Sequence, residues 1–95
     1  MIENNVTPPV VSQKKTFKTS DIYYASYLCA IDFSLKNTEA VQTPTGGKKV
    51  VFVFSMTDAE QIKAKSLFFG GSGTVKARLF VDHLRSMKQL CFINI

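Results

Sequence analysis

The stretch Lys48-Lys49-Val50-Val51-Phe52-Val53-Phe54-Ser55 decides the fold of this chain. Its β-branched and aromatic residues favour extended backbone. The run from Val50 to Phe54 is apolar at every position, whereas a strand with one solvated face alternates between apolar and polar residues. We therefore predict a strand that lies at the centre of a sheet or is covered on both of its faces.

A β-hairpin is predicted around this strand. The segment Thr43-Pro44-Thr45-Gly46-Gly47 favours a turn, and the polar segment 34–42 before it has the pattern of a weak strand. A hairpin of two strands is only marginally stable in water. We therefore expect a further strand, which residues 91–95, the N-terminal arm or a second copy of the protein could supply.

A first helix is predicted over residues 22–31, before the hairpin. Thr19 or Ser20 can cap its first turn by accepting a hydrogen bond from a free N–H, and Asp21 favours the positive end of the helix. Spacings of three, four and seven residues place the apolar side chains on one stripe. That stripe consists of Tyr24, Tyr27, Leu28 and Ile31. We interpret the tyrosine rings as core, with stacking on a ligand as the alternative.

A second helix is predicted from Thr57-Asp58-Ala59-Glu60, which has the pattern of a capping box. In this motif Thr57 binds the amide of Glu60 while the Glu60 side chain reaches back to the amide of Thr57. The helix is expected to end at Gly70-Gly71, where a residue must take the left-handed conformation. Its predicted inner face consists of Ala59, Ile62, Ser66 and Phe69.

A third helix is predicted to open at Thr74 or Val75, with an apolar stripe of Phe80, Leu84, Met87 and Cys91. The expected fold is therefore α+β, ordered helix, hairpin, helix, helix, with a small antiparallel sheet that the C-terminus or a homodimer could complete. Residues 1–17, with the pair Pro8-Pro9, have the pattern of an extended arm, and residues 18–95 are expected to form a single domain.

Residues able to carry catalysis do not group in the sequence, so we predict that the protein is not an enzyme. His83 is the only histidine, and Asp82 beside it points to a different side of the helix. Cys29 and Cys91 lack the close spacing of structural zinc ligands and are expected to be reduced, with a disulfide between them as the alternative. No cofactor and no metal are expected.

The glycine-rich segment 70–73 precedes a helix, and such turns can hold phosphate with exposed amides. Thr74-Val75 follows the last glycine where a P-loop needs Lys-Ser or Lys-Thr, and no strand leads into the segment. We therefore interpret it as a linker between two helices.

Twelve Lys and Arg residues against seven Asp and Glu give a formal net charge of +5, which favours polyanionic partners. The basic residues form three clusters: one in the arm, one after the hairpin turn and one on the last helix. If these clusters converge, they form a phosphate-binding surface, whereas solvated faces are the alternative. The candidate nucleic-acid-binding residues are Lys14, Lys15, Lys18, Lys48, Lys49, Arg78, Arg85 and Lys88.

The sequence contains no apolar run long enough to cross a bilayer, and its first residues lack the basic and apolar segments of a secretory signal. We therefore expect no membrane partner and a cytoplasmic setting, which is the cytoplasm of the host cell if the protein is viral.

Three blocks of the chain resemble a small family of domains of unknown function from bacteria, phages and mobile elements. The opening Lys18-Thr19-Ser20-Asp21-Ile22-Tyr23 is the most specific, and Gly46 to Phe54 and Leu84-Arg85-Ser86-Met87-Lys88 follow in the expected order. The resemblance spans residues 18–92 and implies a phage or mobile-element origin. It implies no functional residues.

Two functions follow as hypotheses from charge and from this resemblance. The first is a small, basic, non-enzymatic binding module associated with nucleic acid, either DNA or RNA. The alternative is a protein–protein interaction or structural component, such as a phage-encoded inhibitor or particle subunit, in which the incomplete sheet meets a protein partner or forms a homodimer.

Overall fold

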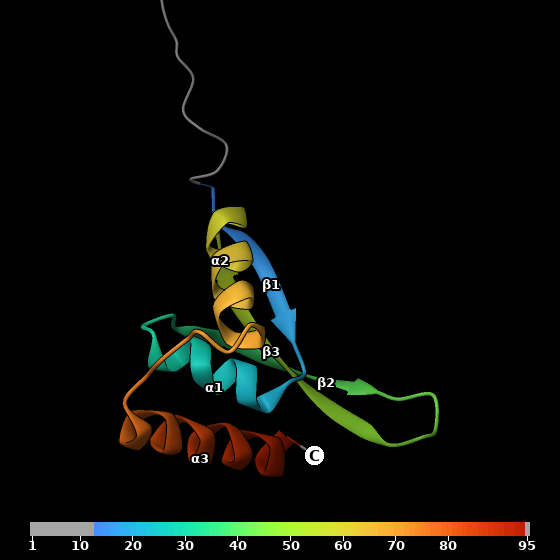
Figure 1. The fold of residues 1–95 in the computed structure, drawn as a ribbon. Helices are drawn as coiled ribbons and strands as arrows, with labels where there is room; N and C mark the ends of the chain where they lie inside the picture. The colour runs from blue at the N-terminus through green and yellow to red at the C-terminus, as the bar shows by residue number, and fades with distance from the viewer. Residues whose placement is uncertain (1–12, 95) are drawn as a thin grey trace, which may run out of the picture.

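The computed structural model describes residues 13–94 of the 95-residue chain. Its elements are β1 (Lys15–Thr19), α1 (Ile22–Ala30), β2 (Leu35–Gln42), β3 (Lys48–Met56), α2 (Asp58–Phe69) and α3 (Ala77–Asn94). The predicted α+β class and the order helix, hairpin, helix, helix are confirmed, with one strand added at the start (Figure 1). The predictions made for Pro8-Pro9 and the rest of residues 1–12 lie outside the described residues.

The three strands form one antiparallel sheet in the order β1-β3-β2. The apolar strand β3 is central, as its sequence predicts. Strand β1 pairs with it from Lys15 opposite Met56 to Thr19 opposite Phe52, so the end of the predicted arm supplies the third strand. The alternative source, residues 91–95, was wrong because α3 continues to Asn94.

The two faces of β3 differ in burial. Val50, Phe52, Phe54 and Met56 are buried, while the three side chains between them are half-buried. The buried face packs against α1 and α3, and it forms one core with their side chains. One face of β3 therefore forms part of the core, and its other face is partly exposed to solvent.

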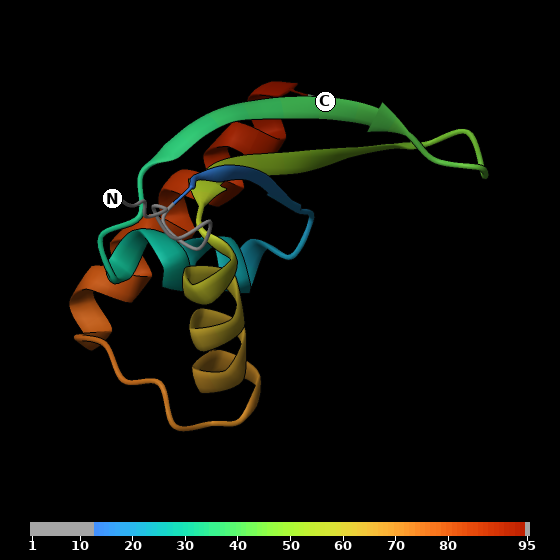
Figure 2. The same cartoon turned by 90° about the horizontal axis from the view of Figure 1, so that it is seen from above.

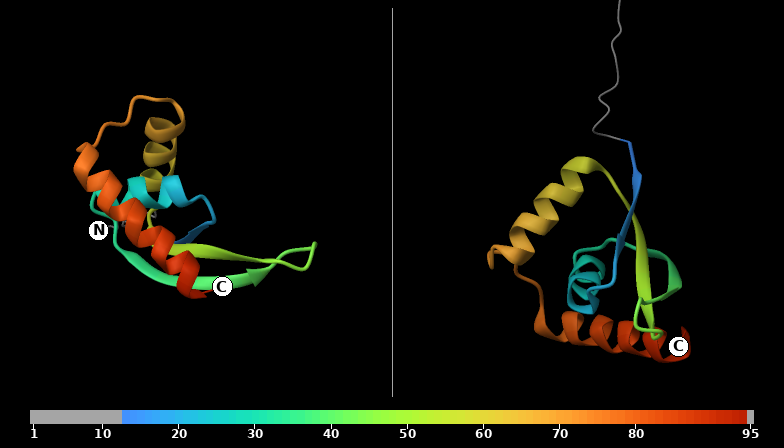
Figure 3. Two further views of the ribbon diagram at one scale, coloured as in Figure 1. Left: turned by 90° about the horizontal axis from the view of Figure 1, so that it is seen from below. Right: turned by 90° about the vertical axis from the view of Figure 1, so that its right-hand side faces the viewer.

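Helix α1 lies at the centre of the molecule, between the sheet, α2 and α3 (Figure 3, right). Every side chain from Tyr24 to Leu28 is buried, and so is Ala30. The predicted apolar stripe was therefore too narrow, because neighbours on several sides of α1 bury more than one of its faces. The interpretation of Tyr24 and Tyr27 as core rings is confirmed, whereas Tyr23 is half exposed.

The cap of α1 is Asp21 itself. Its Oδ1 accepts hydrogen bonds from the amides of Tyr23 and Tyr24 at 2.9 and 3.1 Å. Thr19, one of the two predicted caps, instead accepts a hydrogen bond from the amide of Asp21. The prediction placed the cap one or two residues too early, because Thr19, Ser20 and Asp21 are all residues that can cap a helix.

The capping box of α2 is confirmed. Thr57 Oγ1 accepts from the Glu60 amide at 3.1 Å, and Glu60 Oε1 accepts from the Thr57 amide at 2.8 Å. The C-terminal end also follows the prediction, because Gly71 has φ +79° and takes the left-handed conformation.

The inner face of α2 differs from the prediction. Ala64 is buried and Phe68 packs against the core, whereas Ile62 and Phe69 are 71% and 59% exposed. Apolar residues occur on both faces of this helix, so their spacing alone does not select the face that α1 contacts. In α3 the predicted stripe is confirmed in part, since Met87 is buried and Phe80 and Cys91 pack against the core, whereas Leu84 is absent from the core and Leu90 takes part in it. This helix begins at Ala77, two or three residues later than predicted.

Candidate nucleic-acid interface

The three predicted lysines of the arm all form ion pairs. Lys14 Nζ lies 2.6 Å from Glu60 Oε1, and Lys15 Nζ lies 2.9 Å from Asp58 Oδ2. These pairs join the start of β1 to the first turn of α2. Lys18 Nζ lies 3.1 Å from Glu39 Oε1 and joins β1 to β2 across β3. Each of these cations is therefore partly neutralised by a carboxylate of the same chain.

The two hairpin lysines lie on a ribbon that extends beyond the body of the protein (Figure 2). Lys48 is opposite Gln42 and Lys49 is opposite Val41, and both lysines are exposed. Successive side chains of a strand point to opposite faces, so Lys48 belongs to the face that carries Val50 and Lys49 to the other face. Within residues 13–94 neither lysine forms an ion pair with a carboxylate.

The three basic residues of α3 are exposed and differ in their partners. Arg78 Nε lies 3.7 Å from Asp82 Oδ2, one helical turn away, and its side chain is 91% exposed. Arg85 and Lys88 form no ion pair with a carboxylate of the described chain. They line an open hollow along α3, of about 560 Å³, together with Gln89, Cys91 and Phe92.

The eight predicted residues do not form one continuous surface. The last turn of α3 lies beside the base of the β2–β3 hairpin, whereas β1 begins at the opposite end of the molecule, beside the first turn of α2 (Figures 1 and 3). The fold thus separates the second half of α3, which carries Arg85 and Lys88, from the start of β1, where Lys14 and Lys15 lie.

Phe92 is a candidate that the sequence analysis missed. Its side chain is 88% exposed and lines the same hollow as Arg85 and Lys88. Residues 85, 88 and 92 are three and four positions apart, a spacing that places side chains on one side of a helix. This signal was present in the sequence, but the expectation of a strand over residues 91–95 concealed it.

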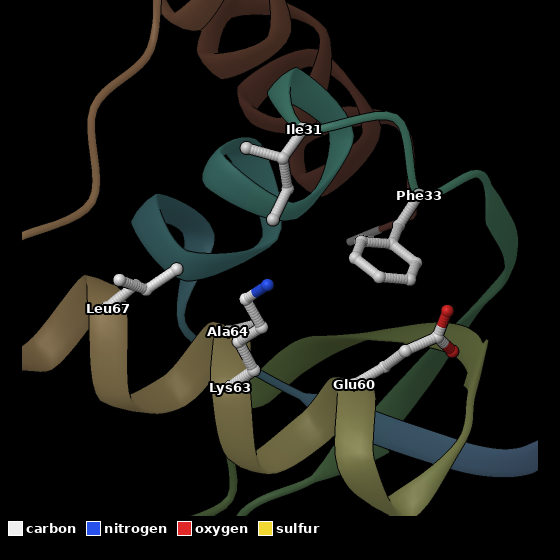
Figure 4. A pocket seen from close by; sticks show the side chains of 6 residues that line it. All are labelled: Ile31, Phe33, Glu60, Lys63, Ala64 and Leu67. Atoms are coloured by element: carbon white, nitrogen blue, oxygen red, sulfur yellow. The ribbon is translucent and has the colours of Figure 1, made fainter.

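A second hollow lies between α1 and α2 and has a volume of about 280 Å³ (Figure 4). Its lining is Ile31, Phe33, Glu60, Lys63, Ala64 and Leu67. Donation from Lys14, and then from the Thr57 amide, lowers the pKa of Glu60 below its usual value. Glu60 is therefore a carboxylate that is already bound by the helix cap and by Lys14. Lys63 is the other charged residue of the lining, and the remaining four lining residues are apolar.

A third hollow is lined by Cys29, Asp32 and His83 among others. Burial raises the pKa of the Cys29 thiol, so this group stays protonated at neutral pH. Both cysteines are free thiols, and the alternative of a Cys29–Cys91 disulfide is not realised. Within the described part of the chain, no group of three His, Cys, Asp or Glu side chains is placed to hold a metal ion.

The glycine-rich linker between α2 and α3 uses its amides internally. The amides of Ser72 and Gly73 both donate to the carbonyl of Leu67, at 3.0 and 2.8 Å. These two amides close the end of α2 and do not face outward to receive a phosphate. The segment serves as the interhelical linker that its sequence predicts.

No family model, no curated protein and no solved structure matches this chain. Of the helices in residues 13–94, none combines the length and the apolar character that crossing a membrane requires.

Proposed function

We propose that this protein is a non-enzymatic nucleic-acid-binding module of phage or mobile-element type that acts in the cytoplasm. The supporting observation is the distribution of unpaired cations. Arg85 and Lys88 on α3 and Lys48 on the hairpin form no ion pair with a carboxylate of the described chain. A phosphate backbone supplies the missing negative charge.

The acidic residues of the described chain have other roles. Asp58, Glu60 and Glu39 pair with the three lysines in and beside β1, and Asp21 caps α1. Pairing thus neutralises the lysines in and beside β1, whereas Arg85, Lys88 and Lys48 keep an unpaired charge within the described chain, as do Lys36, Lys63, Lys65 and Lys76. The lysines of β1 consequently contribute less to binding than the hairpin and α3 do.

The proposal is tested by anisotropy titration of labelled DNA and RNA at several salt concentrations. Arg85→Glu/Lys88→Glu should weaken binding at least tenfold and make the salt dependence shallower. Losing two phosphate contacts lowers the log–log slope by about 1.4 for a single strand, at about 0.7 for each contact. Lys48→Glu/Lys49→Glu should weaken binding as well.

Lys65→Glu/Lys76→Glu is the matched control. Both lysines are exposed and form no ion pair with a described carboxylate. Their replacement lowers the net charge by the same amount as Arg85→Glu/Lys88→Glu does. Equal losses from this control and from the α3 variant would mean that only net charge matters and would contradict the proposed surface. No binding by the unchanged protein at low salt would contradict the function.

A protein-interaction or structural role is the second candidate function, and the edge of the sheet supports it. β2 is an edge strand, and β3 residues 48–51 extend past the end of β1, so within residues 13–94 they have no strand partner on that side. Another strand, including one from a second copy, can pair with such edges. Light scattering that finds a stable homodimer without nucleic acid would favour this role.

A further inference from the structure

We infer that the ligand on α3 is a single-stranded segment of nucleic acid with one base stacked on Phe92. This inference rests on the proposed function and adds to it the class of nucleic acid and a residue that is not basic. It starts from the 88% exposure of the Phe92 side chain, the largest among the exposed apolar side chains of the described residues.

The ring and the cations share one side of α3. Arg85, Lys88 and Phe92 line the same hollow, and Val81, one turn before Arg85, is 40% exposed. A cationic groove that follows the backbone, with an aromatic ring on which a base stacks, is the arrangement by which proteins bind single strands.

Single strands fit this site better than duplexes do. The bases of a duplex are already stacked on one another, whereas an unpaired base has a free face for an aromatic ring. Phenylalanine has no hydrogen-bonding group that reads a base edge, so the site is expected to accept every base. Strong sequence preference is not expected, since stacking tolerates different bases.

A membrane surface fits the same residues less well. A helix that lies on a bilayer needs a wide apolar face directed at the lipid. The apolar stripe of α3 is turned inward instead, with Met87 buried at 4% exposure and Phe80 packed against the core. The large apolar side chains left exposed on this helix are Leu79 and Val81 at its start and Phe92 and Ile93 at its end, and they do not form one continuous stripe along it.

The direct test is Phe92→Trp, because the chain has no tryptophan of its own. An oligothymidylate single strand should quench the introduced tryptophan's fluorescence on binding, since the base stacks on the indole ring. The matching duplex should change the fluorescence much less at the same occupancy. Quenching by the duplex equal to that by the single strand would overturn the inference.

Phe92→Ala should weaken single-strand binding about tenfold or more, which is within the range measured for loss of one stacked base. Ile93→Ala is the matched control, because Ile93 is the neighbouring residue, is 72% exposed and does not line the hollow. Its effect should stay below about twofold. Phe92→Tyr keeps a ring and should bind like the unchanged protein.

The outcomes separate the inference from the proposed function. Salt-dependent binding that Phe92→Ala leaves unchanged would overturn stacking while the nucleic-acid function stands. Absence of any binding by the unchanged protein would remove both. A response of the introduced tryptophan to anionic phosphatidylserine vesicles or to polyglutamate, and not to the oligonucleotide, would assign the hollow to another class of ligand and overturn the inference.

Discussion

Aromatic and basic side chains have different surroundings in two regions of the molecule. One region surrounds α1, and the other is formed by the hairpin and the end of α3. Around α1, aromatic rings contact each other: Tyr24 lies 5.1 Å from Phe68 and 5.9 Å from Phe17 between ring centroids. At the end of α3, Phe92 is exposed and makes no ring contact within residues 13–94. The first arrangement stabilises the fold, and the second leaves an aromatic ring available to a partner.

The charges show the same contrast. Near α2 the lysines of β1 are held by carboxylates and join elements that are distant in sequence. On α3, Arg85 and Lys88 have no such partner among the described side chains. The lysines in and beside β1 thus contribute to the fold through ion pairs, whereas Arg85 and Lys88 keep an unpaired charge at the surface.

Replacing one phenylalanine in each region should give the largest difference. Phe52→Ala removes a ring with 0% exposure and should lower the free energy of unfolding by about 3–5 kcal/mol. Phe92→Ala should change it by no more than about 0.5 kcal/mol, because an exposed side chain loses little packing. Urea unfolding measures both. A loss for Phe92→Ala close to that for Phe52→Ala would break the comparison.

An intermediate effect is expected where the linker meets the core. A Cβ on Gly73 would lie 2.6 Å from the hydroxyl oxygen of Tyr27, which is buried at 4% exposure, so one of the two groups must shift. Gly73→Ala should therefore cost about 1–3 kcal/mol of stability.

Two variants sharpen the interpretation of that result. Gly47→Ala in the hairpin places its Cβ at an ordinary 3.4 Å from Thr43 Oγ1 and should have little effect. Tyr27→Phe in the Gly73→Ala background should recover part of the loss in thermal midpoint, because the closest atom is then gone. Full stability of Gly73→Ala alone would show that the linker does not pack on α1.

The smallest effect concerns the acid dependence of stability. Lys14 and the Thr57 amide lower the pKa of Glu60 in the folded state, so its ionised form favours folding. This contribution is complete above the ordinary glutamate pKa of the unfolded chain and is lost as the pH falls through the lower folded value. Because the pair is partly exposed, it is worth at most about 1 kcal/mol.

Urea midpoints of the unchanged protein and of Glu60→Gln at pH 7 and pH 3 measure this term. The variant should be less stable at pH 7 and should lose less on acidification. Lys14→Met is expected to produce part of the same change, since Thr57 still binds Glu60. An identical acid response of the protein and Glu60→Gln would exclude the ion pair as its source.

Much of the fold could be predicted because it depends on neighbours in the chain. The capping box at Thr57 and Glu60, the turn at Gly46-Gly47 and the apolar strand 50–54 are local features whose physical cause lies within a few residues. The face of α2 could not be predicted in this way, because Ile62 and Ala64 are both apolar and only contact with α1 distinguishes them.

The candidate interface divides in the same manner. The sequence by itself determined which residues carry positive charge, that β3 is central or covered on both faces, and that the last helix has an inner stripe. Only the tertiary structure decided that Lys14, Lys15 and Lys18 meet carboxylates, that β1 completes the sheet, and that Phe92 lies beside Arg85 and Lys88 on a helix. Local conformation follows from adjacent residues, whereas charge pairing and exposure depend on segments that folding brings together from distant positions.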